Sequence, residues 1–239
     1  MAKKKIALIT GANRGLGFEI ARQLGNLGIT VLMTARNQLT ADLAASHLTK
    51  EGIESYGVIL DVINQEDISA LPDFIEKHFG HLDILVNNAG ILLERSSPAT
   101  FDIFQKTFEV NTFAPYLIAT TLLPLLKRSS AGRIVNQSSI LGSITRTSNQ
   151  EEMDSSFLHP AYNASKTALN SLTVILARQL AHTRIKVNAV HPGWVKTDMG
   201  STLAPMEIVD GAKTAVRLAT LPDDGPTGGF FHMDEQLPW

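Results

Sequence analysis

Short apolar runs alternate with longer helical patterns along this chain, and this alternation restricts its possible folds more than any other feature. The apolar runs predict strands at Ile6–Thr10, Thr30–Thr34, Tyr56–Leu60, Ile84–Val86, Arg133–Gln137, Lys186–Val190 and Phe230–His232. Most of them are continuously apolar, which is typical of strands covered on both faces. The helical patterns between them include Leu16–Leu24, Phe101–Lys127, Ala161–Ala181 and Glu207–Ala219, and Pro115 and Pro124 are expected to kink or bound the long one. We therefore predict an α/β fold with a doubly wound, mostly parallel, seven-stranded sheet and helices on both faces.

The chain has the length of one large domain. Its 239 residues contain no visible internal repeat, low-complexity stretch or Pro/Gly/Ser linker, so we predict a single domain over residues 1–239. Hydrophobic residues make up 44% of the chain and charged residues 18%, as in ordinary soluble proteins. The formal net charge of −2 gives no electrostatic reason to expect nucleic acid or a membrane surface as a partner.

The composition also excludes several kinds of chemistry. The chain has no cysteine, which excludes disulfides, thiolate metal sites and cysteine nucleophiles. Its seven histidines show no metal-ligand spacing, so no metal site is predicted. The first apolar run is too short to span a bilayer or to form the core of a signal peptide. A cytoplasmic location is the default expectation.

A glycine-rich loop follows the first predicted strand. In open parallel sheets, ligands bind outside the carboxyl ends of the strands, so the loops there should carry the chemistry. Gly11, Gly15 and Gly17 follow Ile6–Thr10 and open the first helix. Glycines at such a place permit a tight turn and close backbone approach to a pyrophosphate, which the helix N-terminus then stabilises. The loop therefore predicts a dinucleotide site, although its G-x-x-x-G-x-G spacing differs from G-x-G-x-x-G.

This variant spacing is one of a series of ordered matches along nearly the whole chain. The others are Asp61-Val62, Asn87-Asn88-Ala89-Gly90, Asn111, Ser139, Tyr162-x-x-x-Lys166 and His191-Pro192-Gly193. In this order they resemble the short-chain dehydrogenase/reductase family, which implies a Rossmann-type fold, a nicotinamide dinucleotide cofactor and hydride transfer. The glycine loop, the stretch 192–198 and the closing Leu237-Pro238-Trp239 look most like its carbonyl-reductase-like and C-factor-like branch.

Tyr162 and Lys166 are the first two candidate catalytic residues. They lie four positions apart on a predicted helix and therefore share one face. An adjacent ammonium favours the phenolate form of a tyrosine, so that Tyr162 can protonate an alkoxide or deprotonate an alcohol near neutral pH. An isolated Tyr-x-x-x-Lys would be an amphipathic surface pair, and the family context is what favours catalysis here.

The resemblance implies catalytic roles for Ser139 and Asn111 as well. The hydroxyl of Ser139 should hydrogen-bond the substrate oxygen, and its plain alternative is a turn or capping serine. Ser138 is the nearest other candidate, but Ser139 fits the family register better. Asn111 corresponds to the asparagine that holds a water connecting Lys166 to solvent. Otherwise Asn111 would be a polar packing residue.

Most of the other matched residues are candidates for binding the cofactor. The resemblance assigns the nicotinamide ribose to Lys166 and the adenine region to Asp61. It assigns the nicotinamide carboxamide to Pro192, Gly193 and Thr197. Asp61 could instead end a strand or cap a helix, and Thr197 could be a helix N-cap. The full set is Gly11, Asn13, Arg14, Gly15, Leu16, Gly17, Arg36, Asp61, Val62, Asn88, Ala89, Gly90, Tyr162, Lys166, Pro192, Gly193, Val195 and Thr197.

The end of the second predicted strand indicates which dinucleotide is bound. An NAD enzyme places a carboxylate there, which binds both ribose hydroxyls and repels a 2′-phosphate. Here Ala35 stands at that position, and the guanidinium of Arg36 can grip the phosphate instead. Arg14 can approach from the opposite side, although each arginine alone would be an ordinary surface residue. We predict NADPH/NADP+ as the cofactor.

One interval departs from the common family pattern. Ser139 and Tyr162 are 162 − 139 = 23 positions apart, which is longer than is usual in the family. The excess lies near Thr145–Phe157 and includes the acidic stretch Asn149–Asp154, which is either a solvated loop or a flap over the substrate pocket. The resemblance implies a homo-oligomer, a dimer or a tetramer, but the insertion leaves the oligomeric state open.

Together these observations predict an enzyme that uses NADPH to reduce a ketone or aldehyde to an alcohol. The alternative is an NADP(H)-binding signalling or sensor protein of the C-factor kind, and the presence of all four catalytic residues favours the enzyme. A nucleotide-sugar epimerase fits less well, because the longer C-terminal substrate domain expected there is missing. Mostly apolar candidates for the pocket suggest a hydrophobic small-molecule substrate: Leu92, Leu93, Ile140, Leu141, Trp194, Met199, Leu203 and Met206.

Overall fold

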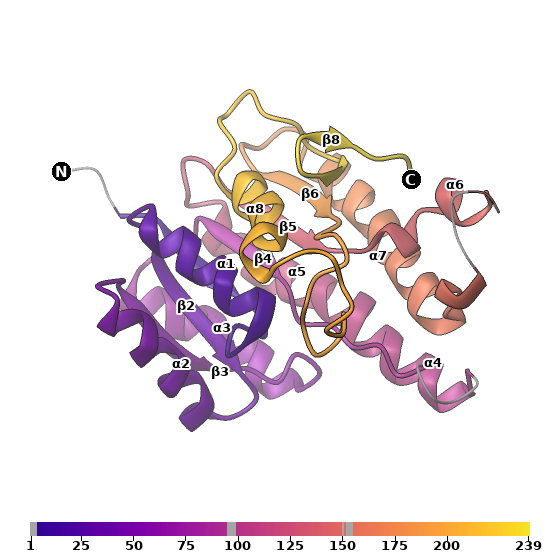
Figure 1. Cartoon of the computed structure of the whole chain (residues 1–239). Coiled ribbons are helices and arrows are strands. Elements are labelled where there is room, and N and C mark those ends of the chain that lie inside the picture. The colour runs from indigo at the N-terminus through magenta and orange to yellow at the C-terminus, as the bar shows by residue number, and fades with distance from the viewer. Residues whose placement is uncertain (1–3, 95–98, 150, 152–154) are drawn as a thin grey trace.

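The computed structural model describes residues 4–94, 99–149, 151 and 155–239. These residues form one open β-sheet with helices packed on it. The strand order is β3-β2-β1-β4-β5-β6-β7-β8 (Figure 1). Every neighbouring pair is parallel except β7 and β8, which are antiparallel. The strands are β1 (Ile6–Ile9), β2 (Thr30–Ala35), β3 (Ser55–Ile59), β4 (Ile84–Asn87), β5 (Arg133–Gln137), β6 (Lys186–Val190), β7 (Phe230–His232) and β8 (Glu235–Gln236).

The predicted fold class is confirmed, with one strand more than expected. β5, β6 and β7 have the predicted bounds, and β1 to β4 differ by one residue at one or both ends. The prediction of seven strands is wrong because β8 contains only Glu235 and Gln236, which are exposed and carry no apolar pattern. The strand order reverses between β1 and β4, and in such sheets the crevice at the carboxyl ends beside this reversal is where ligands bind.

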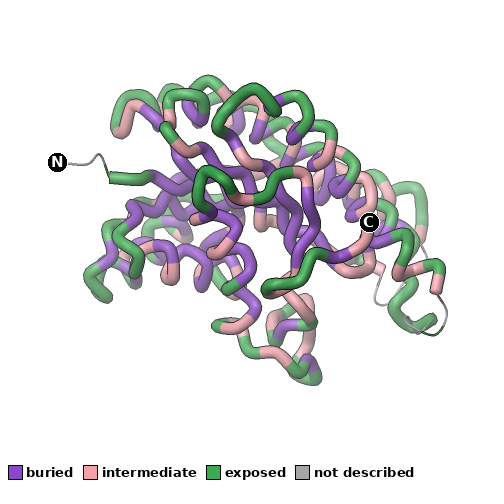
Figure 2. The backbone as a smooth tube through the Cα atoms, turned by 90° about the horizontal axis from the view of Figure 1, so that it is seen from above, coloured by how far each residue is buried: buried purple, intermediate pink, exposed green. Residues whose placement is uncertain are grey.

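Helices cover both faces of the sheet. α1, α2 and α8 pack on one face through a buried cluster that includes Ile20 and Leu48, and α3, α5 and α7 pack on the other through Leu71 and Leu122. Figure 2 shows the buried strands enclosed by these layers. The helices are α1 (Gly15–Asn26), α2 (Gln38–Lys50), α3 (Gln65–His78), α4 (Phe101–Phe108), α5 (Ala114–Leu126), α6 (Ile144–Thr147), α7 (Pro160–Gln179) and α8 (Ile208–Ala219).

The helical pattern over Phe101–Lys127 is interrupted near Pro115, as the prolines predict. α4 passes into a π-helical turn over Glu109–Phe113 before α5 begins. Pro115 has no N–H to donate to a carbonyl of the preceding turn, and the π-helical turn lies directly before the start of α5. Pro124 lies inside α5. Single π-helical turns frequently lie at functional sites, and this one carries the buried Asn111.

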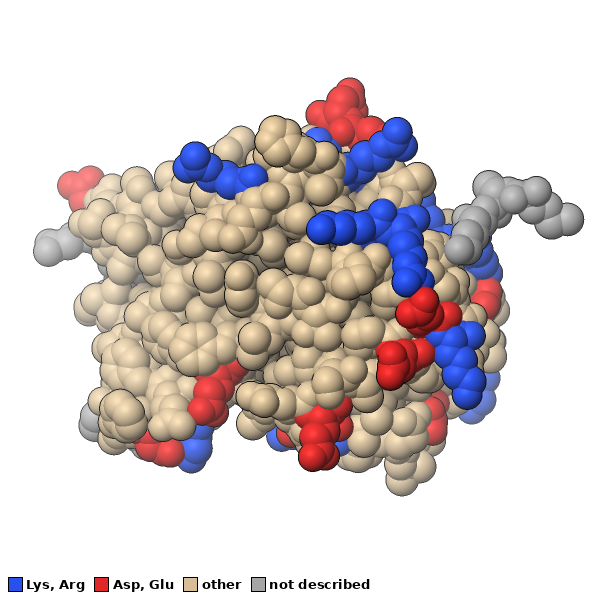
Figure 3. Space-filling model, turned by 180° about the vertical axis from the view of Figure 1, so that it is seen from behind, with Lys and Arg blue, Asp and Glu red and all other residues tan. Residues whose placement is uncertain are grey.

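The surface agrees with the small net charge. On the face shown in Figure 3, positive and negative side chains lie near one another, and much of the surface is neutral. Among the described residues, no helix combines the length and apolarity that a membrane crossing requires.

Candidate active site

A cavity of ≈ 2510 Å³ runs along the carboxyl ends of the strands. Pockets for single small molecules commonly measure about 300–1,000 Å³, so this one has room for a dinucleotide and a substrate together. Every residue predicted to bind the cofactor lines the cavity, and so does Ser139. Asn111 is buried behind the wall and does not line it.

The glycine loop packs against the loop after β4 too closely for larger side chains. A Cβ atom on Gly17 would lie 2.4 Å from Asn88 Nδ2 and 2.5 Å from the carbonyl oxygen of Gly11. Gly11 and Gly15 have φ angles of 61° and 56°, in the left-handed region that glycine adopts most readily. The side chain of Arg14, the N-cap residue of α1, makes no capping hydrogen bond, so the first N–H groups of the helix can serve an anion. This cradle fits a pyrophosphate.

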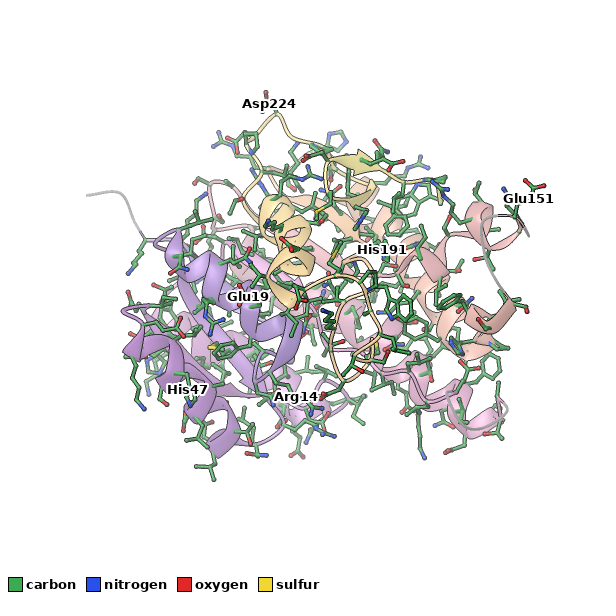
Figure 4. The ribbon with its side chains drawn as sticks, viewed as in Figure 1. Arg14, Glu19, His47, Glu151, His191 and Asp224 are labelled. Atoms are coloured by element: carbon green, nitrogen blue, oxygen red, sulfur yellow. The ribbon has the colours of Figure 1, made fainter. Side chains whose placement is uncertain are left out.

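The two arginines predicted beside a 2′-phosphate have different surroundings. Arg36 is exposed on the cavity wall and forms no ion pair with any residue that the structure describes. It precedes Asn37, whose side chain caps α2 by accepting from the N–H of Thr40 at 2.8 Å. Arg14 forms an ion pair with Asp198, with 2.8 Å between Nη1 and Oδ2, and lies close beneath the loop after β6 in Figure 4. Arg36 is therefore the more available of the two.

Tyr162 and Lys166 lie one turn apart on α7, and both are buried. Lys166 Nζ is 5.7 Å from the centre of the Tyr162 ring, and it donates to the carbonyl oxygen of Gln137 at 2.7 Å. Burial lowers the pKa of Lys166 from 10.5 to about 8. The phenol of Tyr162 lies 4.0 Å from Met199 Sδ, which comes from the loop after β6.

Ser138 and Ser139 follow β5 and face different surroundings. Ser138 Oγ donates to Asn170 Oδ1 at 2.6 Å, inside the packing between β5 and α7. Ser139 Oγ accepts from the N–H of Leu141 at 3.2 Å, so it does shape the turn over Ile140–Gly142. Ser139 Oγ also keeps its own proton to donate, because accepting a bond leaves that proton available. The geometry favours Ser139 over Ser138 as a substrate contact.

Asn111 holds the loop after β4 in place. Its Oδ1 accepts from the N–H of Ile91 at 2.9 Å, and its Nδ2 donates to the carbonyl of Ile91 at 2.9 Å and to Ser165 Oγ at 3.1 Å. Asn111 therefore does have the polar packing role that the sequence analysis gave as its alternative. Gly90 keeps the neighbouring space open, because a Cβ atom there would lie 3.4 Å from Asn111 Oδ1 and 3.6 Å from Lys166 Nζ.

His191 supports the same site, although the His191-Pro192-Gly193 match implied no catalytic role for it. Its Nδ1 accepts from the N–H of Ile140 at 3.2 Å, which ties the serine turn to the end of β6. The ring of His232 lies 4.9 Å away, between ring centres. Burial, and then the charge of His232, lower the pKa of His191 to about 3, so its ring is neutral near pH 7. Figure 4 shows His191 near the middle of the molecule.

Two smaller features complete the cofactor side. The backbone N–H of Asp61 donates to Asp67 Oδ2 at 2.7 Å, and Asp61 Oδ1 accepts from the N–H of Ile63 at 3.3 Å. Thr197 Oγ1 accepts from the N–H of Gly200 at 3.0 Å, so Thr197 caps a turn and not a helix. Within the described part of the chain, no cluster of three or more His, Cys, Asp or Glu side chains could hold a metal ion.

The comparisons with known proteins agree with this geometry. A family model described as short chain dehydrogenase matches residues 5–208. This chain belongs to that family. Carbonyl reductase (NADPH) 3 of Rattus norvegicus is 36% identical over 257 residues, which cover 92% of this chain and 92% of that protein. Carbonyl reductase (NADPH) 1 of Bos taurus is 34% identical over 273 residues, which cover 98% of each chain.

Solved structures of the same family also match this short-chain dehydrogenase. The NADPH-bound carbonyl reductase from chicken fatty liver gives a TM-score of 0.85 at 28% identity, covering 99% of this chain and 100% of that chain. Together with the two sequence relatives, this match identifies the carbonyl-reductase-like branch of the family.

The inserted segment of this short-chain dehydrogenase lies against its C-terminal residues. The N–H and Oγ1 of Thr145 in α6 donate to the carbonyl of Trp239 at 3.0 and 2.7 Å. Within the acidic stretch Asn149–Asp154, residues 150 and 152–154 lie outside the described residues, so the choice between a flap and a solvated loop stays a prediction. Glu151 lies at the outer edge of the molecule in Figure 4, away from His191.

The cavity of this short-chain dehydrogenase reaches the described end of the insertion. The ring of Phe157 lies 5.8 Å from that of Trp194 in an edge-to-face arrangement, and both rings line the cavity. Of the apolar pocket candidates, Leu203 is 82% exposed and Met206 packs behind Gly193, and neither lines the cavity. The other six line it: Leu92, Leu93, Ile140, Leu141, Trp194 and Met199. His159, which the sequence places near the active site without a catalytic role, also lines it, and so does Arg146, which the sequence did not single out.

Proposed function

We propose that this short-chain dehydrogenase uses NADPH to reduce a ketone or aldehyde to the corresponding alcohol, as one domain over residues 1–239. The observation that carries the proposal is that Tyr162, Lys166 and Ser139 line the same cavity as the glycine cradle. Two relatives are named carbonyl reductase (NADPH), and these names support the reaction and the cofactor. No observation favours a sensor of the C-factor kind over an enzyme.

The residues around the cavity fit NADPH. The cradle of Gly11 and Gly17 would hold the pyrophosphate, and Arg36 would bind the 2′-phosphate, since no carboxylate stands at Ala35 to repel it. Lys166 would reach the nicotinamide ribose, while Pro192 and its neighbours would bind the carboxamide. Bound NADPH supplies a hydride to the carbonyl carbon of the substrate.

Proton transfer falls to Tyr162 in this proposal. As the carbonyl oxygen gains negative charge, the phenol of Tyr162 gives it a proton, and the hydroxyl of Ser139 donates a hydrogen bond to the same oxygen. The ammonium of Lys166, 5.7 Å from the ring centre, stabilises the phenolate that remains. In the reverse direction the phenolate takes the proton from the alcohol.

The proton that Tyr162 gives up must then be replaced. Gly90 leaves space between Asn111 and Lys166, and polar groups on both sides can hold a water there. We propose that this water connects Lys166 to solvent and that Asn111 keeps the path open by fixing Ile91.

The apolar lining of the cavity supports a hydrophobic substrate. We also propose a cytoplasmic enzyme, whose dimeric or tetrameric state remains a prediction.

The proposal is tested by following NADPH oxidation with a panel of ketones and aldehydes of increasing size. We expect turnover with apolar carbonyl compounds, and Tyr162→Phe prepared in the same way should bind NADPH but turn over at least ~10²-fold more slowly. A parent protein that binds NADPH but oxidises it with no carbonyl compound would contradict the proposed reaction. Turnover by Tyr162→Phe at the parent rate would leave the reaction standing and remove the tyrosine mechanism.

A further inference from the structure

The helix that carries Tyr162 has no cap from its own sequence. Its N-cap residue, His159, makes no side-chain bond to the first turn, and Pro160 at the first position has no N–H. The first N–H groups of a helix need partners from outside its own backbone, and usually a nearby side chain provides them. Here the N–H groups of Ala161 and Tyr162 donate to Glu94, at 2.9 Å to Oε1 and 2.8 Å to Oε2.

Glu94 reaches α7 from the loop after β4, far away in sequence. The same loop contributes Asn88 and Leu92 to the cavity wall. Asn111 fixes Ile91 through both backbone groups of that residue. The segment from Ile91 to Glu94 is therefore held at one end by Asn111 and at the other by the first turn of α7.

We propose that Glu94 is a positioning residue for the reaction, whose carboxylate fixes the first turn of α7 so that the phenol of Tyr162 stays aligned with the cavity. This inference rests on the proposed function. Glutamate suits the task because its two oxygens serve two N–H groups at once, and because a negative charge is favourable at a helix N-terminus. The bond to the N–H of Tyr162 acts on the backbone of the reacting residue itself.

The test compares substitutions that remove the two acceptors stepwise. Glu94→Gln keeps the length and one acceptor oxygen, and Glu94→Ala removes both. At saturating NADPH we expect Glu94→Ala to lower kcat about tenfold while KM for the carbonyl substrate and Kd for NADPH change less than about twofold, because small misplacements of a reacting group reduce turnover more than binding. Glu94→Gln should fall between the parent and Glu94→Ala.

Asn64→Ala is the matched control. Asn64 caps α3 by accepting from the N–H groups of Glu66 and Asp67 at 2.8 and 3.3 Å, and α3 carries none of the candidate catalytic residues. Its loss should lower the melting temperature, as the loss of Glu94 does, but leave kcat unchanged. A kcat for Glu94→Ala within twofold of the parent, or an equal fall in Asn64→Ala, would overturn the positioning role.

Hydrogen exchange separates this inference from the proposed function. We expect the amides of Ala161 and Tyr162 to exchange faster in Glu94→Ala than in the parent and to be unaffected in Asn64→Ala. This measurement needs no turnover, so a parent without reductase activity would contradict the function while the amides still report on the cap. Unchanged exchange at both amides would show that Glu94 does not hold α7. If Glu94→Ala fails to fold, Glu94→Gln carries the same comparison.

Discussion

Lys166 Nζ lies 5.7 Å from the centre of the Tyr162 ring and is held there by the carbonyl oxygen of Gln137, 2.7 Å away. The contact to β5 fixes the ammonium relative to the sheet, whereas both side chains belong to α7. A positive charge in a buried place stabilises a nearby phenolate more than it would in water. The arrangement therefore couples the charge of Lys166 to proton exchange at Tyr162.

Replacing Tyr162 with phenylalanine should remove the proton donor and little else. We expect Tyr162→Phe to lower turnover by at least ~10²-fold, the usual scale of general acid–base assistance. The ring stays, so its packing and the affinity for NADPH should remain close to those of the parent. Single-turnover oxidation of NADPH and fluorescence titration of the cofactor measure the two effects separately. Turnover within a few-fold of the parent in a folded variant would refute the assignment.

The low pKa of Lys166 predicts how stability depends on pH. The folded protein releases this proton near pH 8 and the unfolded chain near pH 10.5, so the unfolded state binds more protons between these values. The free energy of unfolding therefore rises with pH in this window, by about 1 kcal/mol between pH 7 and pH 9. Lys166→Met should lack this rise. Urea unfolding of both proteins without cofactor, at the two pH values, gives the difference directly, and parallel curves would contradict the shift.

Much of the fold follows from local sequence patterns. The predicted bounds of β5, β6 and β7 are the observed ones, although these strands (RIVNQ, KVNAV and FFH) mix apolar with polar residues. β8 has no apolar pattern, since two exposed residues pair only because β7 lies beside them. The π-helical turn around Asn111 also escapes prediction, because apolar periodicity does not distinguish it from an α-helix.

Some residues of the candidate site could be predicted from the sequence and others could not. Glycines, Tyr162 and Lys166 are recognised by fixed spacing, because the loop and the helix that hold them are continuous in sequence. Glu94 and His191 act through backbone groups of distant segments, and no spacing encodes those contacts. The ion pair of Arg14 with Asp198 is likewise visible only once the loops after β1 and β6 are placed together.

His191 predicts a sensitivity to acid. Its ring is kept neutral in the folded protein down to about pH 3, whereas in the unfolded chain it takes up a proton near pH 6.5. Stability contributed by this group is therefore lost as pH falls below 6.5, by about 2 kcal/mol between pH 7 and pH 5. His191→Asn offers Ile140 an acceptor that does not titrate, so this variant should lose less stability over that range. Denaturant titrations at pH 7 and pH 5 provide the check, and an equal loss in both proteins would be evidence against the neutral histidine.

Phe157 should influence the choice of substrate. Its ring packs against Trp194 on the wall of the cavity. We expect Phe157→Ala to change the ratio of kcat/KM for large and small carbonyl compounds by about tenfold, the scale of a lost apolar contact. NADPH affinity should stay within twofold. Phe101→Ala is the control, because that ring is 83% exposed and does not line the cavity. An unchanged ranking of substrates in Phe157→Ala would exclude this segment from the substrate pocket.

Cofactor choice can be tested at the end of β2. Ala35 offers no carboxylate to repel a 2′-phosphate, and Arg36 lies exposed on the cavity wall with its guanidinium unpaired among the described residues. Two charge-assisted hydrogen bonds at roughly 1.5–3 kcal/mol each would give a preference for NADPH over NADH of at least ~10²-fold. The parent should therefore show that ratio in kcat/KM for the two cofactors.

The double variant Ala35→Asp with Arg36→Ala should shift this preference toward NADH, because it removes the attraction and adds a repulsion. Arg128→Ala is the matched control for a lost surface charge, since Arg128 pairs with Glu76 and does not line the cavity. Its cofactor ratio should equal that of the parent. The ratio should also fall with added salt in the parent, because exposed charges are screened over about 8–10 Å at physiological ionic strength. A parent that uses both cofactors equally, or prefers NADH, would show that Arg36 does not select the phosphate.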